Sequence, residues 1–284
     1  MLRTEIEPAR IAAKTGYLPI EDYAMVGDLY TVALVGKNGS IDSGCRPDFD
    51  SPSVFGALLD AGKGGHFRLA PAAQDGVSTK QMYFPESNIL ITRFLCHHGV
   101  GEITDFMPVK QAGDQGPEHH LVRAVHMVRG ALTFAIRCRP AFNYARDPHE
   151  LRLEERGAVF TGPALTLALS SSVPLNDDGC GGAQAVFTLI EDQSAYFFLD
   201  SSPDRHLRPH PVSRDMYEDQ FAETRRYWRR WLSQCHYQGR WREPVQRSAL
   251  ALKLLTYAPT GAIVAAPRRA FLSTSAGSGT GIIA

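Results

Sequence analysis

The chain has 284 residues, of which 44% are hydrophobic and 21% charged, so it can bury a sizeable core in one large domain or two modest ones. Its 30 Lys and Arg balance 30 Asp and Glu, which excludes the excess positive charge typical of proteins that bind nucleic acid or an anionic membrane. No apolar stretch approaches the roughly 18 residues of a membrane helix, and we expect no secretory leader.

The first half of the chain predicts antiparallel strands. Asn38-Gly39, between two short apolar stretches, is a strong signal for a hairpin turn. Phe134, Ile136 and Cys138 alternate with less apolar neighbours, which is the period of a strand. Arg129-Gly130 is interpreted as a turn between two of the strands. The predicted strands between about residues 80 and 200 are 89–95, 102–107, 121–128, 132–139, 165–169, 186–190 and 196–199.

After residue 200 the pattern changes from strands to helices. Prolines at 203, 209 and 211 predict a linker, and Ser213 can cap a helix that runs to about Gln234. A second helix is predicted to begin near Arg242, with Pro244 in its first turn. Residues 268–284 are rich in Ser, Gly and Thr and are expected to be flexible.

The predicted fold is therefore mainly β, an antiparallel sandwich followed by linker helices and a flexible tail. We expect a sandwich domain over 1–205, helices over 206–267 and the tail over 268–284. The second helix is apolar around most of its circumference, so it needs partners on several sides. We expect self-association through 242–257, driven by Val245, Leu250, Leu252, Leu254 and Leu255.

Short segments in a fixed order carry a resemblance to a known family. The first contain Leu-Pro-Ile-Glu-Asp-Tyr (18–23), Gly-Asp (27–28), Ala-Leu-Val-Gly (33–36) and Gly-Ser-Ile-Asp (39–42). The others are 49–55, 64–67, 103–108, 240–248, 252–257 and 261–267. Together they resemble the N-terminal region of glycoside hydrolase family 15, which includes bacterial glucoamylases and trehalases.

The resemblance implies a sandwich that precedes an (α/α)6 barrel, in which two carboxylates hydrolyse an α-glucoside or trehalose with inversion. It also implies that this chain stops about one helix into the barrel, as a truncated form, so no catalytic residue, cofactor or metal ligand is assigned to it. The family's Trp-Leu-Cys-Leu-Pro-Arg is replaced here by residues 43–48, Ser-Gly-Cys-Arg-Pro-Asp, which leaves less apolar surface to bury.

Acidic side chains in the matching segments were weighed as catalytic groups. They are Glu21, Asp22, Asp28, Asp42, Asp48, Asp50 and Asp105. Asp beside Gly and Pro is more often a turn residue, so we favour structural roles and single out Asp28 and Asp42 as the pair to examine.

Histidines and cysteines give no metal signal. Adjacent histidines at 97–98 and 119–120 point to opposite faces of a strand, and the prolines around His206 and His210 oppose a regular helix that could pair them. Five scattered cysteines without a Cys-x-x-Cys motif indicate a reducing cytoplasm.

Aromatic and basic side chains near the helices leave two alternatives open. Trp228, Trp231 and Trp241 either stack on sugar rings or, as we favour, seal the linker helix against the sandwich. The basic cluster in 225–230 is either solvated or pairs with the barrel. The leading hypothesis is a non-catalytic sandwich of a family 15 enzyme; the alternatives are a stand-alone carbohydrate-binding module and a residually active glycosidase.

Overall fold

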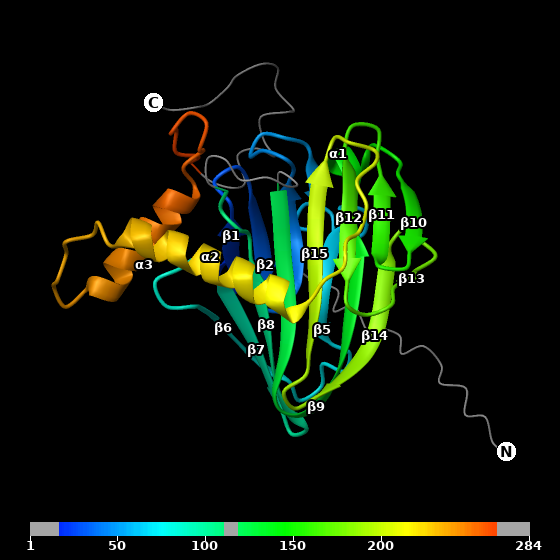
Figure 1. The fold of residues 1–284 in the computed structure, drawn as a ribbon, viewed down its shortest axis with the longest axis horizontal. Coiled ribbons are helices and arrows are strands. Elements are labelled where there is room, and N and C mark those ends of the chain that lie inside the picture. The colour runs from blue at the N-terminus through cyan, green and yellow to red at the C-terminus, as the bar shows by residue number, and fades with distance from the viewer. Residues whose placement is uncertain (1–16, 111–118, 266–284) are drawn as a thin grey trace.

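The computed structural model describes residues 17–110 and 119–265. The tail predicted over 268–284 lies outside these residues, and so do the last two residues of the resembling segment 261–267. The structure is mainly antiparallel β-sheet, as predicted, with two longer helices near the C-terminal end (Figure 1).

The described strands alternate with short turns until the two helices begin. The strands are β1 (Tyr23–Gly27), β2 (Val32–Gly36), β3 (Ser40–Cys45), β4 (Ser53–Phe55), β5 (His66–Pro71), β6 (Ser78–Tyr83), β7 (Leu90–Cys96), β8 (Gly99–Phe106), β9 (His119–Arg139), β10 (Glu150–Glu154), β11 (Gly157–Thr161), β12 (Thr166–Ser171), β13 (Asn176–Asp177), β14 (Ala183–Ile190) and β15 (Ser194–Ser202). The helical segments are a 3-10 turn η1 (Ile20–Asp22), α1 (Phe142–Ala145), α2 (Arg214–Leu232) and α3 (Arg242–Leu254).

Strand β9 belongs to both layers of the sandwich. Its first part pairs with β8 and β15 in sheet B, which continues through β7 and β6 on one side and through β12, β11 and β10 on the other. Its second part pairs with β5 and β14 in sheet A, which contains β1 to β5, β13 and β14. One continuous strand therefore passes from one layer into the other.

The prediction of a turn at Arg129-Gly130 is wrong. Arg129 pairs with Val100 and Gly130 pairs with Gly99, so the backbone continues as a strand. Gly130 has φ of 77°, a left-handed value that favours glycine, and a Cβ atom there would lie 2.2 Å from the carbonyl oxygen of His98. The glycine thus permits a change of direction within β9 and not a reversal of the chain.

The main core lies between the two sheets. Phe134, Ile136 and Cys138 on β9 are fully buried, as their alternation predicts, and pack with Phe67 and Leu69 of β5. The predicted hairpin at Asn38-Gly39 is confirmed between β2 and β3, and Gly39 has φ of 76°. The substituted segment 43–48 is not loosely packed at its start, because Ser43, Gly44, Cys45 and Arg46 are all buried.

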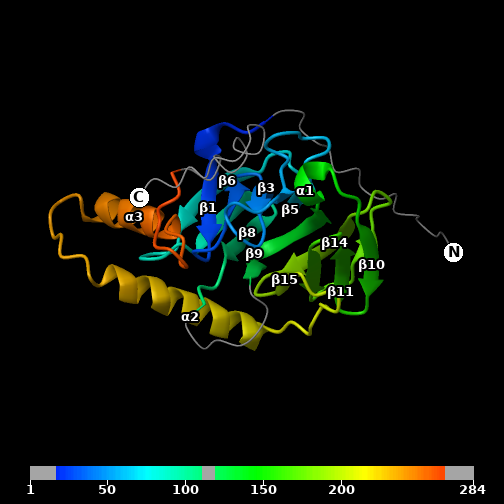
Figure 2. The same cartoon turned by 90° about the horizontal axis from the view of Figure 1, so that it is seen from above.

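Helix α2 lies across the outer face of sheet B (Figures 1 and 2). The Ser213 hydroxyl accepts the N–H of Met216 at 3.2 Å, which confirms the predicted cap. Tyr217 and Phe221 pack on Phe106 of β8 within a second apolar cluster. The segment that leads into α2 contacts β12, where the His210 N–H donates to Ser170 Oγ at 2.9 Å, and β12, predicted from its alternation, is buried on both faces.

Helix α3 packs beside the C-terminal half of α2 over one end of sheet A. Leu250 and Leu254 are buried against Trp228, Leu29 and Val32 in a third cluster. Arg247 donates to the carbonyl oxygen of Ser87 at 2.8 Å, and its guanidinium lies 3.9 Å from the ring centroid of Tyr83. Both helices begin where the sequence predicts, and we call α2 and α3 together the helical layer.

Candidate functional site

The two aspartates singled out for examination, Asp28 and Asp42, bind the backbone and local side chains. Asp28 is buried in the β1–β2 turn, where one carboxylate oxygen accepts the N–H groups of Tyr30 at 3.0 Å and Thr31 at 2.9 Å. Asp42 on β3 accepts the hydroxyl of Tyr23 at 2.8 Å and that of Ser40 at 2.5 Å. Each carboxylate therefore has the structural role that turns and strand ends give to aspartate.

The other acidic candidates are dispersed in the same way. Asp105 is fully buried on β8, Asp22 pairs with Lys37 and Asp48 accepts the hydroxyl of Tyr257 at 3.0 Å. Glu21 and Asp50 are exposed to solvent. Asp22, Asp48 and Asp105 thus have different partners, and Glu21 and Asp50 lie in solvent.

Asp105 forms a buried ion pair inside the sandwich. Arg123 Nε donates to Asp105 Oδ1 at 2.8 Å, and both side chains are completely buried. The remaining guanidinium donors reach the carbonyl oxygens of Phe67 at 2.5 Å and Gly39 at 2.8 Å. Because every group has a partner, the pair is a structural link between the two sheets and not an available acid.

A second polar cluster lies where the sandwich meets the segment that leads into α2. Asp200 of β15 is fully buried, and its two carboxylate oxygens lie 2.6 Å from His120 Nδ1 and 3.2 Å from His210 Nε2. Burial alone would raise the pKa of Asp200, but the two imidazoles outweigh it and the pKa falls below its usual value. The same contact with Asp200 raises the pKa of His210. We call these three residues the His-Asp-His cluster.

Arg46 provides further positive charge near this cluster. Burial lowers the pKa of its guanidinium, while the carboxylates of Asp28 and Asp200 act in the opposite direction. Within the described ranges its Nη1 atom has no hydrogen-bond partner.

The backbone of His210 is also bound, because its N–H donates to Ser170 Oγ at 2.9 Å. The cluster therefore attaches residues 203–213, the connector between β15 and α2, to β12 and β15.

The His-Asp-His cluster is not arranged as a metal site. Its imidazoles contact the carboxylate directly, and over residues 17–110 and 119–265 no group of three His, Cys, Asp or Glu is placed to hold a metal ion. His206, which shares the spacing noted in the sequence, is exposed, and its N–H donates to Asp204 at 2.8 Å.

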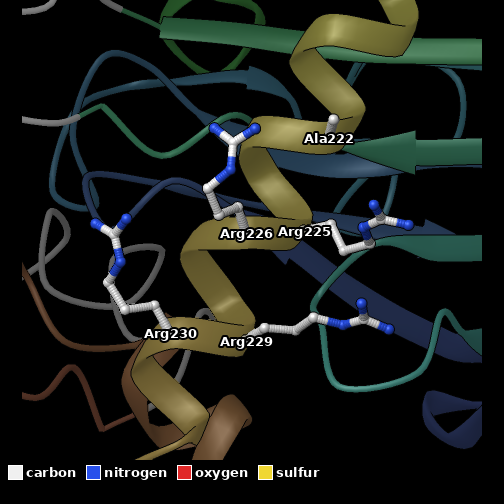
Figure 3. Close-up of a pocket in the computed structure, with 5 residues that line it drawn as sticks. All are labelled: Ala222, Arg225, Arg226, Arg229 and Arg230. Carbon is white, nitrogen blue, oxygen red and sulfur yellow. The ribbon is translucent and has the colours of Figure 1, made fainter.

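A shallow groove follows the outward side of α2. It is lined by Ala222, Arg225, Arg226, Arg229 and Arg230. Arg225 and Arg229 project to one side of the helix, and Arg226 and Arg230 project to the other (Figure 3). Arg229 lies 3.4 Å from Glu86, while the other three arginines have no ion pair among the described residues. The groove is thus an exposed cationic surface.

The three tryptophans do not form one cluster. Trp228 is completely buried and Trp231 is half-buried, so these two seal α2 as we favoured. Trp241 is 56% exposed and its ring lies 4.5 Å from the guanidinium carbon of Arg240. The aromatic platform expected for a carbohydrate-binding module is missing from the strands, because none of those described carries an exposed Phe, Tyr or Trp.

The apolar side chains of α3 are mostly covered. Leu250 and Leu254 are buried, Val245 and Leu255 are half-buried, and only Leu252 among the five is exposed, at 56%. Tyr237, Trp241 and Ile263 are also exposed. We call these four exposed side chains the apolar end of the helical layer: Tyr237, Trp241, Leu252 and Ile263.

Two of these features could not be recognised in the sequence. The His-Asp-His cluster depends on the pairing of β9 with β15, which places His120 opposite Asp200 although they are 80 residues apart. The buried Arg123–Asp105 pair likewise depends on the register of β8 and β9.

No helix in the described ranges has the length and apolar character to cross a membrane.

Known proteins share this sequence pattern. A family model described as "Trehalase-like, N-terminal" matches residues 13–187. The trehalase of Thermoplasma volcanium is 35% identical over 256 residues, which are 89% of this chain and 40% of that protein. The trehalase of Mycolicibacterium smegmatis is 33% identical over 91% of this chain and 41% of its own length, and trehalase 1 of Sulfolobus acidocaldarius is 29% identical over 88% and 40%. The chain therefore spans about 40% of the length of these relatives.

The family model covers more than half of the residues, from the segment before η1 to within β14. Its range includes β9, on which both sheets depend. The chain belongs to the trehalase-like N-terminal family.

Proposed function

We propose that this chain is the non-catalytic β-sandwich unit of a trehalase-type glycoside hydrolase of family 15. The observation that supports the proposal is the combination of a family match over the sandwich with acidic side chains that all hold structural or solvated positions. The substrate we propose for the whole enzyme is trehalose, because the relatives are trehalases; glucoamylase-type α-glucosides are the second candidate.

In this proposal residues 1–205 form the sandwich domain and 206–267 form the linker and the first barrel helix; the tail expected over 268–284 lies outside the described residues. The catalytic carboxylates, in this proposal, lie in a barrel that the described residues do not form. The location we propose is the cytoplasm, on the cysteine pattern alone; all five described cysteines are free thiols.

The proposed structural role predicts which part of the enzyme covers the apolar end of the helical layer. Trp241, Leu252 and Ile263 each expose more than half of their surface, and we propose that the barrel covers them. The self-association expected through 242–257 would depend on Leu252 alone among the five apolar side chains named for it.

Activity measurements on the purified chain test the non-catalytic role. We expect no release of glucose from trehalose, maltose or soluble starch. Turnover that disappears in Asp28→Asn or Asp42→Asn, while the sandwich stays folded by circular dichroism, would overturn the role and support the residually active glycosidase.

A chimera tests the assignment to trehalases. The aligned N-terminal region of the Thermoplasma volcanium trehalase is replaced by this chain, and trehalose hydrolysis is measured. We expect the chimera to be active, and we expect Trp241→Ser with Leu252→Ser to lower its activity and its melting temperature. The matched control is Val186→Ser with Ile190→Ser, which changes two similarly exposed side chains on β14. A folded chimera without trehalose hydrolysis would contradict the proposal.

A further inference from the structure

The outward face of α2 carries opposite charges in two blocks. The N-terminal block contains Asp215, Glu218 and Asp219, all exposed. The C-terminal block contains Arg225, Arg226, Arg229 and Arg230, of which Arg225 is half-buried and the other three are exposed. Two exposed charges, Arg214 and Glu223, do not follow this division. Ala222 lies between the blocks and is the one small residue that lines the groove.

Three residues of each block match in pairs about Ala222. Asp219 and Arg225 are each three residues from it, Glu218 and Arg226 four, and Asp215 and Arg229 seven. Separations of three, four and seven place residues on one face of a helix. A carboxylate on one side of Ala222 therefore has an arginine at the same distance on the other side, on the same face.

A twofold axis converts this arrangement into a self-complementary surface. When two identical helices meet antiparallel, a residue that precedes the axis in one copy lies opposite the residue that follows it by the same distance in the other. We propose that two copies of this chain associate through antiparallel pairing of α2 about Ala222. With 3.6 residues per turn, Asp219 then lies on the same side of the contact as the partner's Arg226, Glu218 on the same side as the partner's Arg225, and Asp215 near the partner's Arg229.

The shape of the groove also favours the α2 helix of a second copy as its occupant. Ala222 lies at the N-terminal end of the groove, ahead of all four arginines, and their side chains do not cover it (Figure 3), so a second helix can approach at the small residue. The carboxylates of the approaching helix would enter between the arginine side chains. An isologous contact of this kind is closed and gives a dimer, not a fibre.

The helix macrodipole gives a competing explanation of the charges. It favours acids in the first turn of a helix and bases in the last, and its effect declines beyond them. In α2 (Arg214–Leu232), Asp219, Arg225 and Arg226 lie outside both end turns. The macrodipole thus accounts for Asp215 and Arg229, but not for the matched inner pairs.

Two contacts within the chain compete with the dimer. Arg214 donates to Glu218 at 2.6 Å, and Arg229 lies 3.4 Å from Glu86. All four side chains are more than 40% exposed, so these pairs are weak and can exchange partners. The association is accordingly weak, reversible and sensitive to salt, because exposed charges are screened over a few ångströms at high ionic strength.

Sedimentation velocity of the whole chain over a range of concentrations tests the proposal. At about 0.02 M salt we expect a monomer–dimer equilibrium, and at about 0.5 M salt a dissociation constant at least about tenfold higher. Arg225→Glu/Arg226→Glu/Arg229→Glu should also remove the dimer. The control, Arg129→Glu/Arg152→Glu/Arg156→Glu, makes the same change in net charge on exposed arginines of the sandwich and should retain it.

A mixing experiment distinguishes self-pairing from other occupants. The variant Asp215→Arg/Glu218→Arg/Asp219→Arg should be monomeric alone, and an equimolar mixture with the triple glutamate variant should form a heterodimer. The proposal is overturned if the unaltered chain is monomeric at all concentrations at low salt, or if the mixture does not associate. Association that resists salt and is abolished by Leu252→Ser would overturn it too, by locating the contact at the apolar end of the helical layer.

Discussion

The sandwich and the helical layer are stabilised in different ways. Between the sheets, large side chains such as Phe67, Phe134 and Phe197 are completely buried, and each guanidinium nitrogen of the buried Arg123–Asp105 pair has an acceptor. The helical layer buries Trp228, Leu250 and Leu254 on one side only and presents arginines on the other. The sandwich is a closed core, whereas the helical layer has a second surface that is available to a partner.

The buried ion pair of the sandwich should give the largest loss of stability. Asp105→Ala leaves the Arg123 charge uncompensated inside the core, which costs roughly 3–5 kcal/mol of unfolding free energy. Chemical denaturation measures this cost. The control Glu218→Ala removes an exposed ion pair of α2 and should cost much less. Equal effects would contradict the contrast between the two regions.

The next effect should be confined to the helical layer. Leu250→Ala opens a cavity against Trp228 and should cost about 2–5 kcal/mol. Hydrogen exchange should become faster in α2 and α3 while β9 stays protected, since the main core is not altered. Leu252→Ala, two residues away and 56% exposed, is the matched control and should change little. Faster exchange across β9 in Leu250→Ala would show that the two regions open together.

The smallest effect concerns pH and the contact between the two regions. The folded pKa of His210 is raised, so its contribution to stability is complete below the unfolded value of about 6.5 and is lost as pH rises through the folded value. Asp200 has a lowered folded pKa, and its contribution is lost only as the medium becomes acidic. The wild-type chain should therefore lose more stability than His210→Gln between about pH 6 and 8.5, by under about 1 kcal/mol.

Thermal unfolding at several pH values measures that difference. Ser170→Ala is the control, because it removes the hydrogen bond to the His210 N–H without changing the imidazole or Asp200. It should lower stability by a similar amount at each pH. If His210→Gln has the same pH dependence of stability as the wild-type chain, protonation of His210 does not stabilise the contact between the His-Asp-His cluster and the segment that leads into α2.

Local signals made the helices and most hairpins predictable. Ser213 caps α2, Pro244 lies in the first turn of α3, and Asn38-Gly39 closes a hairpin, each because the residue type satisfies a backbone requirement at that position. The path of β9 could not be predicted, because Arg129-Gly130 resembles a turn until its partners are known. Those partners include Gly99 and Val100 of β8.

The candidate site was less predictable than the fold. The structural role favoured for Asp28 has a local signal, since aspartate near glycine often completes a turn, whereas Asp42 lies within β3 and bonds to Tyr23 and Ser40. The His-Asp-His cluster has no local signal, because strand register alone brings its members together. The arginines of α2 were visible in the sequence, but the groove they form around Ala222 depends on which side of the helix faces the sheet.

The shared strand β9 also has a consequence for how the chain folds. Its partners come from both directions in the sequence: β5 and β8 precede it, while β14 and β15 are made later. Sheet A cannot be completed before residue 190 has left the ribosome, nor sheet B before residue 202, and many contacts close long loops, which slows folding. During synthesis the exposed edges of β9 would be open to wrong pairing. A chaperone that binds extended apolar strands would therefore be needed most in the interval between β9 and β15.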